Sequence, residues 1–504
     1  MAILLLGFAL RMIHLDLLPL IGDEAYYRLW SRDLAFSYYD HPAGVALMLR
    51  ASTMLAGDGE FGIRWLNAML GFVTSVLAMA VGRRLLSRWA GVFAGAAIAL
   101  GAPYLIVARF VYTDVLLLIT VLLNLWAFDT LLEDDDCPQV AKGIFFGVTL
   151  ILLLNTKYSA YLYVAALGGW ILAERRTLLR RWAFWMGMGM GVLGLLPVVL
   201  WNAAHDWVSF RWQLSHFGMR SPGSQPLPLA LQVLTNARHA WTYLTPPVFL
   251  AGIVGLGRLR RARERLLSWV ALAMLIPVAL SAANSPRNLT TGWVLLLMLA
   301  GTRLRIWRLA WPNRRSGLGF SRGLERQRSS TVGRRRLLIT GLTLGLFLAL
   351  GAFGVGTVAA LSGWLTPLQS GAVRDIMRDA VGWRALGDAF ADWNGAILTV
   401  DYSIAAQITY YAGSPAVTPW GQYLLWDWPL LDPVLVVSRE YLPMACVTQV
   451  LSEAFRVVDG PGVWRVEDFG IARELHLWRA KRLRVEQAVL LQDLDFLNLQ
   501  VVCR

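Results

Sequence analysis

The sequence predicts an α-helical polytopic membrane protein with a soluble α/β domain at its C-terminal end. Two observations support this prediction. The chain of 504 residues is 57% hydrophobic and only 16% charged, whereas an ordinary soluble domain has about 25% charged and about 45–50% apolar residues. Long apolar stretches also recur from the N-terminus to about residue 361, and alternating patterns replace them afterwards. The composition excludes an ordinary soluble enzyme, a disordered chain and a secreted disulfide scaffold.

About eleven stretches qualify as membrane spans, because a spanning helix needs about 20 mainly apolar residues to satisfy its backbone in lipid. The spans are expected at 2–18, 62–81, 89–107, 113–131, 143–156, 158–173, 182–200, 241–257, 266–283, 290–306 and 337–361. The fifth and sixth are short and are separated only by Lys157. The first resembles a signal-peptide core but lacks a basic flank and a cleavage pattern, so we expect it to be retained.

The net charge of +14 is explained by membrane topology rather than by nucleic-acid binding. If the spans are correct, the arginine-rich loops all fall on one side, and an excess of basic residues marks the cytoplasmic side. These arginines are Arg83, Arg84, Arg88, Arg175, Arg176, Arg180, Arg181, Arg258, Arg260, Arg261, Arg263 and Arg265, followed by the basic stretch 303–336. The outer side then receives the segments 16–60 and 202–242, the turns near 109–113, 157 and 284–288, and the C-terminal region.

Two domains are predicted. Residues 1–361 form the multi-spanning domain, and residues 362–504 form an outer α/β domain. In the second domain, alternating stretches at 395–401, 433–437 and 462–466 predict strands, and the patterns at 373–390 and 404–412 predict helices.

The first outer segment contains candidate site residues of two kinds. Asp23 and Glu24 are candidate catalytic carboxylates, and Tyr26, Tyr27, Asp40 and His41 are candidate substrate contacts. Two adjacent carboxylates at the mouth of a membrane helix suit general base catalysis. The alternative is that Asp23 only caps a helix running from residue 24 to residue 34.

Four more ionisable residues lie at the predicted outer boundary of the membrane: Arg64, Arg109, Asp114 and Lys157. Ionisable residues at membrane depth are rare and are functional candidates by default. The alternative for Lys157 and Arg109 is that the side chain extends to the lipid headgroups. For Arg64, which is next to Trp65, the alternative is an interfacial anchor.

His205 and Asp206 lie in a tryptophan-rich segment with Trp201, Trp207 and Trp212. They are candidate substrate contacts, whereas the tryptophans are typical of an interfacial belt. Adjacent residues point in different directions on a helix, and no spacing typical of a metal site accompanies this pair. The sequence therefore predicts neither a metal site nor a cofactor, although it leaves assistance by a divalent metal open.

Five motifs follow one another on the predicted outer side. They are Asp23-Glu-Ala-Tyr-Tyr27, Asp40-His-Pro42, Tyr112-Thr-Asp114, Asn155-Thr-Lys-Tyr-Ser159 and Trp201-Asn-Ala-Ala-His-Asp-Trp-Val-Ser-Phe210. With them the chain resembles the bacterial members of glycosyltransferase family 39 and the related lipid A aminoarabinose and lipopolysaccharide-core galacturonosyl transferases, all of the GT-C superfamily. The pattern Gly382-Trp383, Tyr402 and Tyr410-Tyr411 is similar to the outer domain of that group.

The resemblance implies a glycosyltransferase of the bacterial inner membrane. Such an enzyme moves a sugar from a polyprenyl-phosphate carrier to an extracytoplasmic acceptor: lipid A, lipopolysaccharide or another envelope glycoconjugate. The family's base falls on Asp23 with Glu24 beside it, and its second acidic position falls on Asp114. Its lysine falls on Lys157, which we expect to bind the donor phosphate together with Arg109 or Arg64. A single inverting displacement needs such a base and such cations.

Two departures from the family pattern stand out. The chain has Pro42-Ala43 where the family usually has two prolines, and the stretch 284–291 has no histidine. A transporter or lipid flippase with an outer binding domain is the alternative class. That class predicts charges near the bilayer midplane and repeated halves, whereas here the polar clusters lie at the outer boundary and no repeat is found. A non-catalytic receptor or assembly protein is a third class.

Overall fold

The computed structural model describes most of the chain. The described residues are 2–134, 136–218, 228–257, 259–280, 286–303, 345, 348–362, 371–399, 401–418, 421–425, 433–439, 442–468 and 471–483. The basic stretch 303–336 lies outside the described residues except for Arg303. Of the span predicted at 337–361, residue 345 and residues 348–361 are described.

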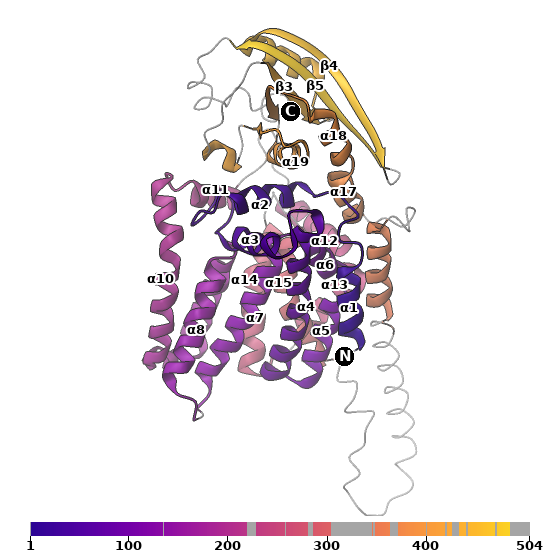
Figure 1. Ribbon diagram of the computed structural model, residues 1–504. Coiled ribbons are helices and arrows are strands. Elements are labelled where there is room, and N and C mark those ends of the chain that lie inside the picture. Colours follow the sequence, from indigo (N-terminus) through magenta and orange to yellow (C-terminus); the bar gives the residue numbers. More distant parts are fainter. Residues whose placement is uncertain are drawn as a thin grey trace, which may run out of the picture.

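The N-terminal part is a bundle of helices (Figure 1). Its helices are α1 (Ala2–Met12), α2 (Gly22–Arg32), α3 (Gly44–Ala56), α4 (Glu60–Leu85), α5 (Arg88–Leu100), α6 (Ala102–Arg109), α7 (Thr113–Leu132), α8 (Gln139–Leu154), α9 (Ala160–Glu174), η1 (Arg176–Arg180), α10 (Trp182–Ala204), α11 (Val208–Gly218), α12 (Leu229–Leu244), α13 (Pro246–Gly255), α14 (Ala262–Leu280), η2 (Pro286–Leu289) and α15 (Thr290–Arg303). A further apolar helix spans Leu348–Leu361.

Among the described residues, three helices are long and apolar enough to cross a membrane: α4, α7 and α10. The span predicted at 89–107 is a pair, α5 and α6, bent by 58° at the break between them. Helices such as α8 and α9 fall on predicted spans but are shorter than 18 residues. The helical, membrane-type character is therefore confirmed, whereas the count of eleven spans stays a prediction.

Ion pairs join several basic loops at one end of the bundle. The carboxylate of Asp129, at the end of α7, is fully buried and lies 3.0 Å from Arg84 of α4 and 2.7 Å from Arg263 of α14. Nearby, Arg265 lies 2.6 Å from Glu174 at the end of α9. Three of the arginines that predict the cytoplasmic side, Arg84, Arg263 and Arg265, thus lie at the same end of the bundle.

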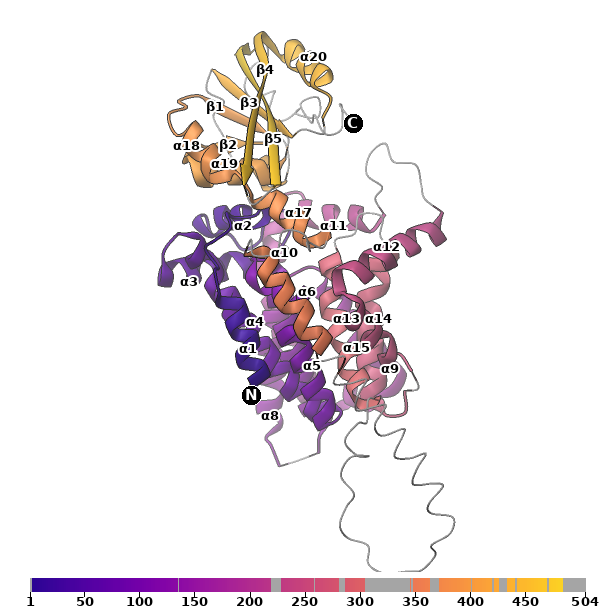
Figure 2. The same cartoon turned by 90° about the vertical axis from the view of Figure 1, so that its right-hand side faces the viewer.

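The C-terminal part contains a five-stranded mixed sheet (Figure 2). Its elements are α17 (Gly371–Ala380), α18 (Trp383–Phe390), β1 (Ala396–Thr399), α19 (Tyr402–Ala412), β2 (Ala416–Val417), η3 (Gly421–Leu425), β3 (Val434–Arg439), α20 (Met444–Ala454), β4 (Phe455–Asp468) and β5 (Ile471–Leu483). The strand order is β2-β1-β3-β5-β4, in which β1 is parallel to β2 and β3, and β5 is antiparallel to β3 and β4. Whether this region is a separate outer domain stays a prediction.

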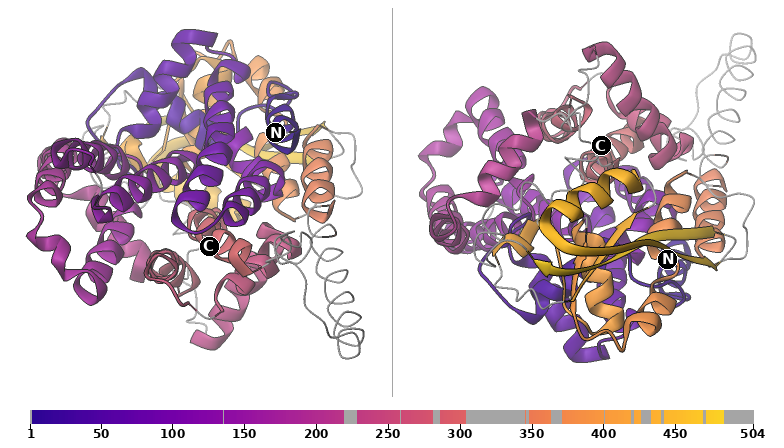
Figure 3. Two further views of the ribbon diagram at one scale, coloured as in Figure 1. Left: turned by 90° about the horizontal axis from the view of Figure 1, so that it is seen from below. Right: turned by 90° about the horizontal axis from the view of Figure 1, so that it is seen from above.

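The sheet region lies over the end of the bundle that carries α2 and α11, opposite the joined basic loops (Figures 1 and 3). One hydrophobic core connects the two parts, because Tyr26 and Trp30 of α2 are buried in the same cluster as Ile404 and Ala405 of α19. Burial of this shared apolar surface fixes α2 between the bundle and the sheet.

Candidate active site

Lys157 forms the centre of a buried polar group at the α2 end of the bundle. It lies in the turn between α8 and α9, and its Nζ is 3.0 Å from Oδ1 of Asp114 and 2.8 Å from Oδ1 of Asn288. Burial lowers the pKa of Lys157, and the charge of Asp114 partly opposes this shift. Oδ2 of Asp114 is buried and has no hydrogen-bond partner among the described residues. The structure therefore brings together two predicted residues, Lys157 and Asp114, and one residue that the sequence does not predict, Asn288.

Asp23 lies beside this group and is held at both oxygens. Arg287 of η2 donates to Oδ2 of Asp23, and the hydroxyl of Tyr402 donates to Oδ1 over 3.0 Å. The guanidinium of Arg287 also stacks on Tyr112, 4.4 Å from the ring centroid. The alternative in which Asp23 caps the helix is wrong, because α2 begins at Gly22 and the carboxylate of Asp23 binds these two side chains.

The two groups are continuous because Arg287 and Asn288 are neighbours in η2. The result is a row in which two cations lie between two carboxylates: Asp23, Arg287, Lys157 and Asp114. In such a row each carboxylate faces a cation, and each cation retains the capacity to bind another anion.

Asp40 lies close enough to Asp23 to be affected by its charge. Burial raises the pKa of Asp40 to about 7, and the charge of Asp23 adds to the shift, whereas hydrogen bonds with Tyr26 and Trp212 oppose it. The hydroxyl of Tyr26 also accepts from the backbone N–H of Gln422, 2.6 Å away. His41 packs beside Tyr27, with the ring centroids 6.0 Å apart. Of the predicted substrate contacts, Tyr26 and Asp40 are thus joined to each other, and His41 adjoins Tyr27.

Glu24 does not share the environment of its neighbour Asp23. Its carboxylate is fully buried and forms a two-pronged pair with Arg64, with distances of 2.8 and 2.6 Å. It also accepts the backbone N–H groups of Ile21 and Val111 at 3.1 and 2.9 Å. The prediction that Glu24 takes part in catalysis does not fit this geometry, because Arg64 and two backbone donors already occupy its oxygens.

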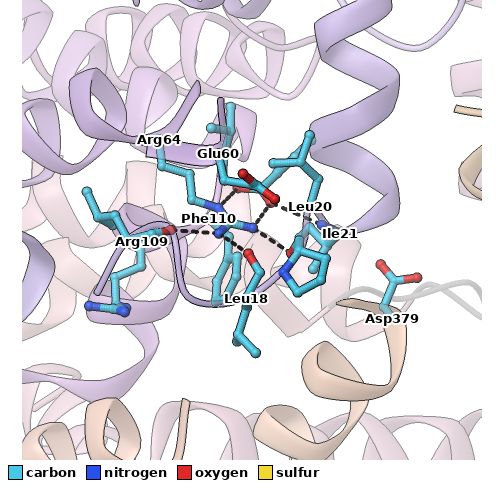
Figure 4. Close-up of polar contacts among 12 residues, drawn as sticks. Leu18, Leu20, Ile21, Glu60, Arg64, Arg109, Phe110 and Asp379 are labelled. Atoms are coloured by element: carbon cyan, nitrogen blue, oxygen red, sulfur yellow. Dashed lines mark hydrogen bonds and ion pairs between the residues drawn. The ribbon is translucent and has the colours of Figure 1, made fainter. Parts of the chain in front are cut away.

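The guanidinium of Arg64 likewise forms its hydrogen bonds with groups of the protein. Its guanidinium donates to the carbonyl groups of Leu15, Leu18 and Pro19 at 2.7–2.8 Å, and Phe110 lies against its face (Figure 4). The prediction that Arg64 binds the donor phosphate does not fit, since these carbonyls and Glu24 use its donors.

Arg109 holds the end of α1. Its guanidinium donates to the carbonyls of Leu10, Ile13 and His14 at 2.9, 2.6 and 3.2 Å. Carbonyl groups at the end of a helix have no intrahelical partner, and a cation is a favourable one. The prediction of a phosphate-binding role for Arg109 does not fit this arrangement either.

His205 and Asp206 are placed differently again. The ring of His205 stacks on Trp201, with centroids 4.1 Å apart, and its Nδ1 lies 2.7 Å from the Trp201 carbonyl. Asp206 is exposed and has a positive φ of 53°. Within the described part of the chain, no three His, Cys, Asp or Glu side chains lie together as a group that would hold a metal ion.

An apolar cavity of about 690 Å³ opens between α3, α7, α8 and α10. Its lining includes Ala43 and Gly44, which closely follow His41, and Asn155 and Thr156, which directly precede Lys157. The wall of the cavity is therefore adjacent along the chain to Lys157 of the polar row.

Sequence reasoning missed Arg287, Asn288, Tyr402 and Trp212 as members of the site. The sequence predicts that the turn containing Arg287 and Asn288 lies on the outer side, and the absence of a histidine is its one departure from the family pattern. Tyr402 belongs to the C-terminal pattern of the resemblance, which implies no role for it. Nothing local to these residues shows that they meet Asp23 and Lys157.

Comparison with known proteins identifies this architecture. Residues 40–201 match the family model described as dolichyl-phosphate-mannose-protein mannosyltransferase. The structure of ArnT from Cupriavidus metallidurans aligns over 95% of this chain and 97% of its own, with 15% identity and a TM-score of 0.57. The chain has the GT-C fold.

Other relatives agree with this GT-C assignment. The undecaprenyl phosphate complex of the same ArnT aligns with a TM-score of 0.56 at 16% identity, over 95% of this chain and 97% of its own. The Archaeoglobus fulgidus oligosaccharyltransferase, solved with zinc and sulfate, aligns with a TM-score of 0.53 at 14% identity, over 87% of this chain and 67% of its own. The lipid A galacturonosyltransferase RgtD of Rhizobium johnstonii is 24% identical over 329 residues, 62% of this chain and 66% of RgtD, which is just under two thirds of its length. The predicted resemblance to GT-C glycosyltransferases is confirmed.

The Glu24–Arg64 pair leads to a test of stability. In a Glu24→Gln variant, Arg64 stays buried without its counter-charge, which we expect to cost about 3–5 kcal/mol. Thermal unfolding of the purified protein in detergent measures this loss. The matched control is Asp134→Asn, which removes the partner of Arg181 at a site where the aspartate is 83% exposed and the expected cost is about 0–1 kcal/mol. Equal melting temperatures for the two variants would contradict the assignment.

The raised pKa of Asp40 predicts how the stability of the protein depends on pH. A carboxyl whose pKa is raised from 3.8 to about 7 by folding contributes stability that is full below about pH 4 and is lost as the pH rises through about 7. Asp40→Asn removes this loss, so the melting temperature of the variant should rise relative to that of the wild type as the pH increases from about 5 to about 8. Asp33→Asn, an exposed neighbour, is the control, and curves that stay parallel for Asp40→Asn would refute the prediction.

Proposed function

We propose that this chain transfers a sugar from a polyprenyl-phosphate carrier to an acceptor outside the cytoplasm. The observation that carries the proposal is the row of Asp23, Arg287, Lys157 and Asp114. An apolar cavity has Thr156, the residue before Lys157, in its wall. Displacement of a lipid phosphate needs a carboxylate to accept a proton and cations to bind the departing phosphate, and this row supplies both.

The reaction is a single inverting displacement. The acceptor hydroxyl attacks the anomeric carbon, the bond from that carbon to the phosphate oxygen breaks, and the proton of the hydroxyl passes to Asp23. The lipid phosphate leaves with the bonding electrons. Asp114 orients Lys157 through their 3.0 Å contact, and Lys157 and Arg287 bind the departing phosphate.

The carrier lipid lies in the 690 Å³ cavity in this proposal. Its lining is mainly aliphatic, which suits a polyprenyl chain, and Thr156 brings one wall of the cavity directly to Lys157. The relative ArnT was solved with undecaprenyl phosphate bound, which supports this class of donor. Arg287 takes the phosphate-binding role that the sequence prediction gave to Arg64 and Arg109.

The acceptor in this proposal is lipid A, lipopolysaccharide or another envelope glycoconjugate. The support comes from the relative RgtD, a lipid A galacturonosyltransferase. We propose a bacterial inner-membrane location with the joined basic loops in the cytoplasm, as their arginine content predicts. Residues 1–361 then form the membrane domain, and residues 362–504 form the extracytoplasmic domain.

The base assignment is tested by Asp23→Asn. Loss of general base catalysis lowers rates by roughly 10²–10⁴-fold, so we expect transfer to fall by that factor while the protein remains in the membrane. The assay incubates purified protein with defined polyprenyl-phosphate sugars and lipid A and measures loss of donor and glycosylated product. Asp33→Asn, at the exposed end of the same segment, should transfer at the wild-type rate. A fully active Asp23→Asn enzyme would rule out Asp23 as the base.

The phosphate assignment is tested by Lys157→Ala and Arg287→Ala. A charge-assisted hydrogen bond is worth about 1.5–3 kcal/mol, so each variant should bind undecaprenyl phosphate about 10- to 100-fold more weakly. Inhibition of transfer by free undecaprenyl phosphate measures this affinity where activity remains, and direct binding measures it where activity is lost. Arg50→Ala, on an exposed position of α3, is the control. Unchanged affinity in both variants would refute the assignment.

A further inference from the structure

The sheet region contributes a dense set of hydrogen bonds to α2 and the loop before it. Besides Tyr402 on Asp23 and Gln422 on Tyr26, these contacts are Gln407 to the Leu20 carbonyl at 2.8 Å, the Leu20 N–H to Tyr411 at 2.6 Å, and the Gly22 N–H to Asp379 at 2.8 Å. The segment that carries Asp23 is thus fixed from the C-terminal side as well as from the bundle.

Tyr402 has a precisely defined position in this interface. It is the first residue of α19, and the carboxylate of Asp401 caps that helix by accepting the N–H groups of Ser403 and Ile404 at 2.9 and 3.0 Å. The approach of α19 to α2 is close, since a Cβ at Gly22 would lie 2.1 Å from Cβ of Ser403. Only glycine fits at position 22, and Tyr402 is thereby held against Asp23.

The environment of Tyr402 keeps its hydroxyl protonated. The charge of Asp23 and burial raise the pKa of Tyr402 well above its ordinary value, and its ring packs 4.6 Å from Tyr26. The phenol is therefore a permanent donor to Oδ1 of Asp23, while Arg287 occupies Oδ2. Two donors on opposite oxygens fix the plane of the carboxylate.

We propose that Tyr402 is a positioning residue for catalysis: the C-terminal region reaches into the membrane site and orients Asp23, the base of the proposed function on which this inference rests. Tyr402 lies outside residues 40–201, which match the family model. The region that carries the sheet is in this way part of the active site and is not only a cover for it.

The hydrogen bond to the ionised carboxylate gives the proposal a specific signature. A donor to the charged form of a base favours that form, so its removal shifts the acidic limb of the rate profile to higher pH. The other titratable or charged groups that face Asp23 remain in place in the variant. They are Arg287, Tyr27, Tyr112, Asp40 and Lys157.

The test compares Tyr402→Phe with Tyr410→Phe in the full-length protein, using a defined polyprenyl-phosphate sugar as donor. For Tyr402→Phe we expect kcat to fall about tenfold, the KM for the donor to stay unchanged, and the acidic limb of the kcat profile to move up by about one pH unit. Tyr410 lies on the same helix and donates to the Asp58 carbonyl at 2.7 Å. Its variant loses an interface hydrogen bond but should retain the wild-type kcat and pH profile.

Wild-type kcat and an unshifted acidic limb in Tyr402→Phe would overturn the proposal. A wild-type protein that consumes no donor would instead refute the proposed function, and the contact is then judged by a double-mutant cycle on melting temperature. In that cycle, Tyr402→Phe should lower the melting temperature in the wild-type background and have a clearly smaller effect in an Asp23→Asn background. Equal effects in both backgrounds would overturn the assignment of Tyr402 to Asp23.

Discussion

The buried pair of Glu24 and Arg64 is the interaction on which the rest of the site depends. Arg64 of α4 donates hydrogen bonds to carbonyl groups of the loop before α2. Glu24 accepts hydrogen bonds from a backbone N–H at the start of α2 and from one in the turn before α7. Two ions buried together are tolerated only when hydrogen bonds satisfy their remaining atoms. Here these additional bonds join three chain segments, so the pair fixes the place where α2 begins.

The start of α2 decides what the neighbouring carboxylate can do. Successive residues on a helix point about 100° apart, so once Glu24 faces Arg64 inside the bundle, Asp23 must face away from it. It then meets Arg287, Tyr402 and the space beside Lys157. Glu24 therefore stabilises the fold, whereas Asp23 faces the residues of the candidate site.

Much of the fold and about half of the candidate site can be predicted from the sequence. Apolar length and arginine placement predicted the helical bundle and the common end of the basic loops. The resemblance to the GT-C transferases predicted that Asp23, Asp114 and Lys157 belong together. Spacing does not reveal partners far along the chain: Arg287 and Tyr402 are 264 and 379 residues from Asp23. It also does not distinguish a guanidinium that binds backbone carbonyls, as in Arg64 and Arg109, from one that is available to a ligand.

The contact between Tyr402 and Asp23 has a consequence for how the protein is made. At about 5–20 residues per second, translation takes roughly 20–75 s to proceed from residue 23 to residue 402. Throughout that interval Asp23 lacks the hydroxyl that donates to its Oδ1 in the folded protein. In the proposed function, the base therefore reaches its final orientation only after α19 has been synthesised and has packed against α2.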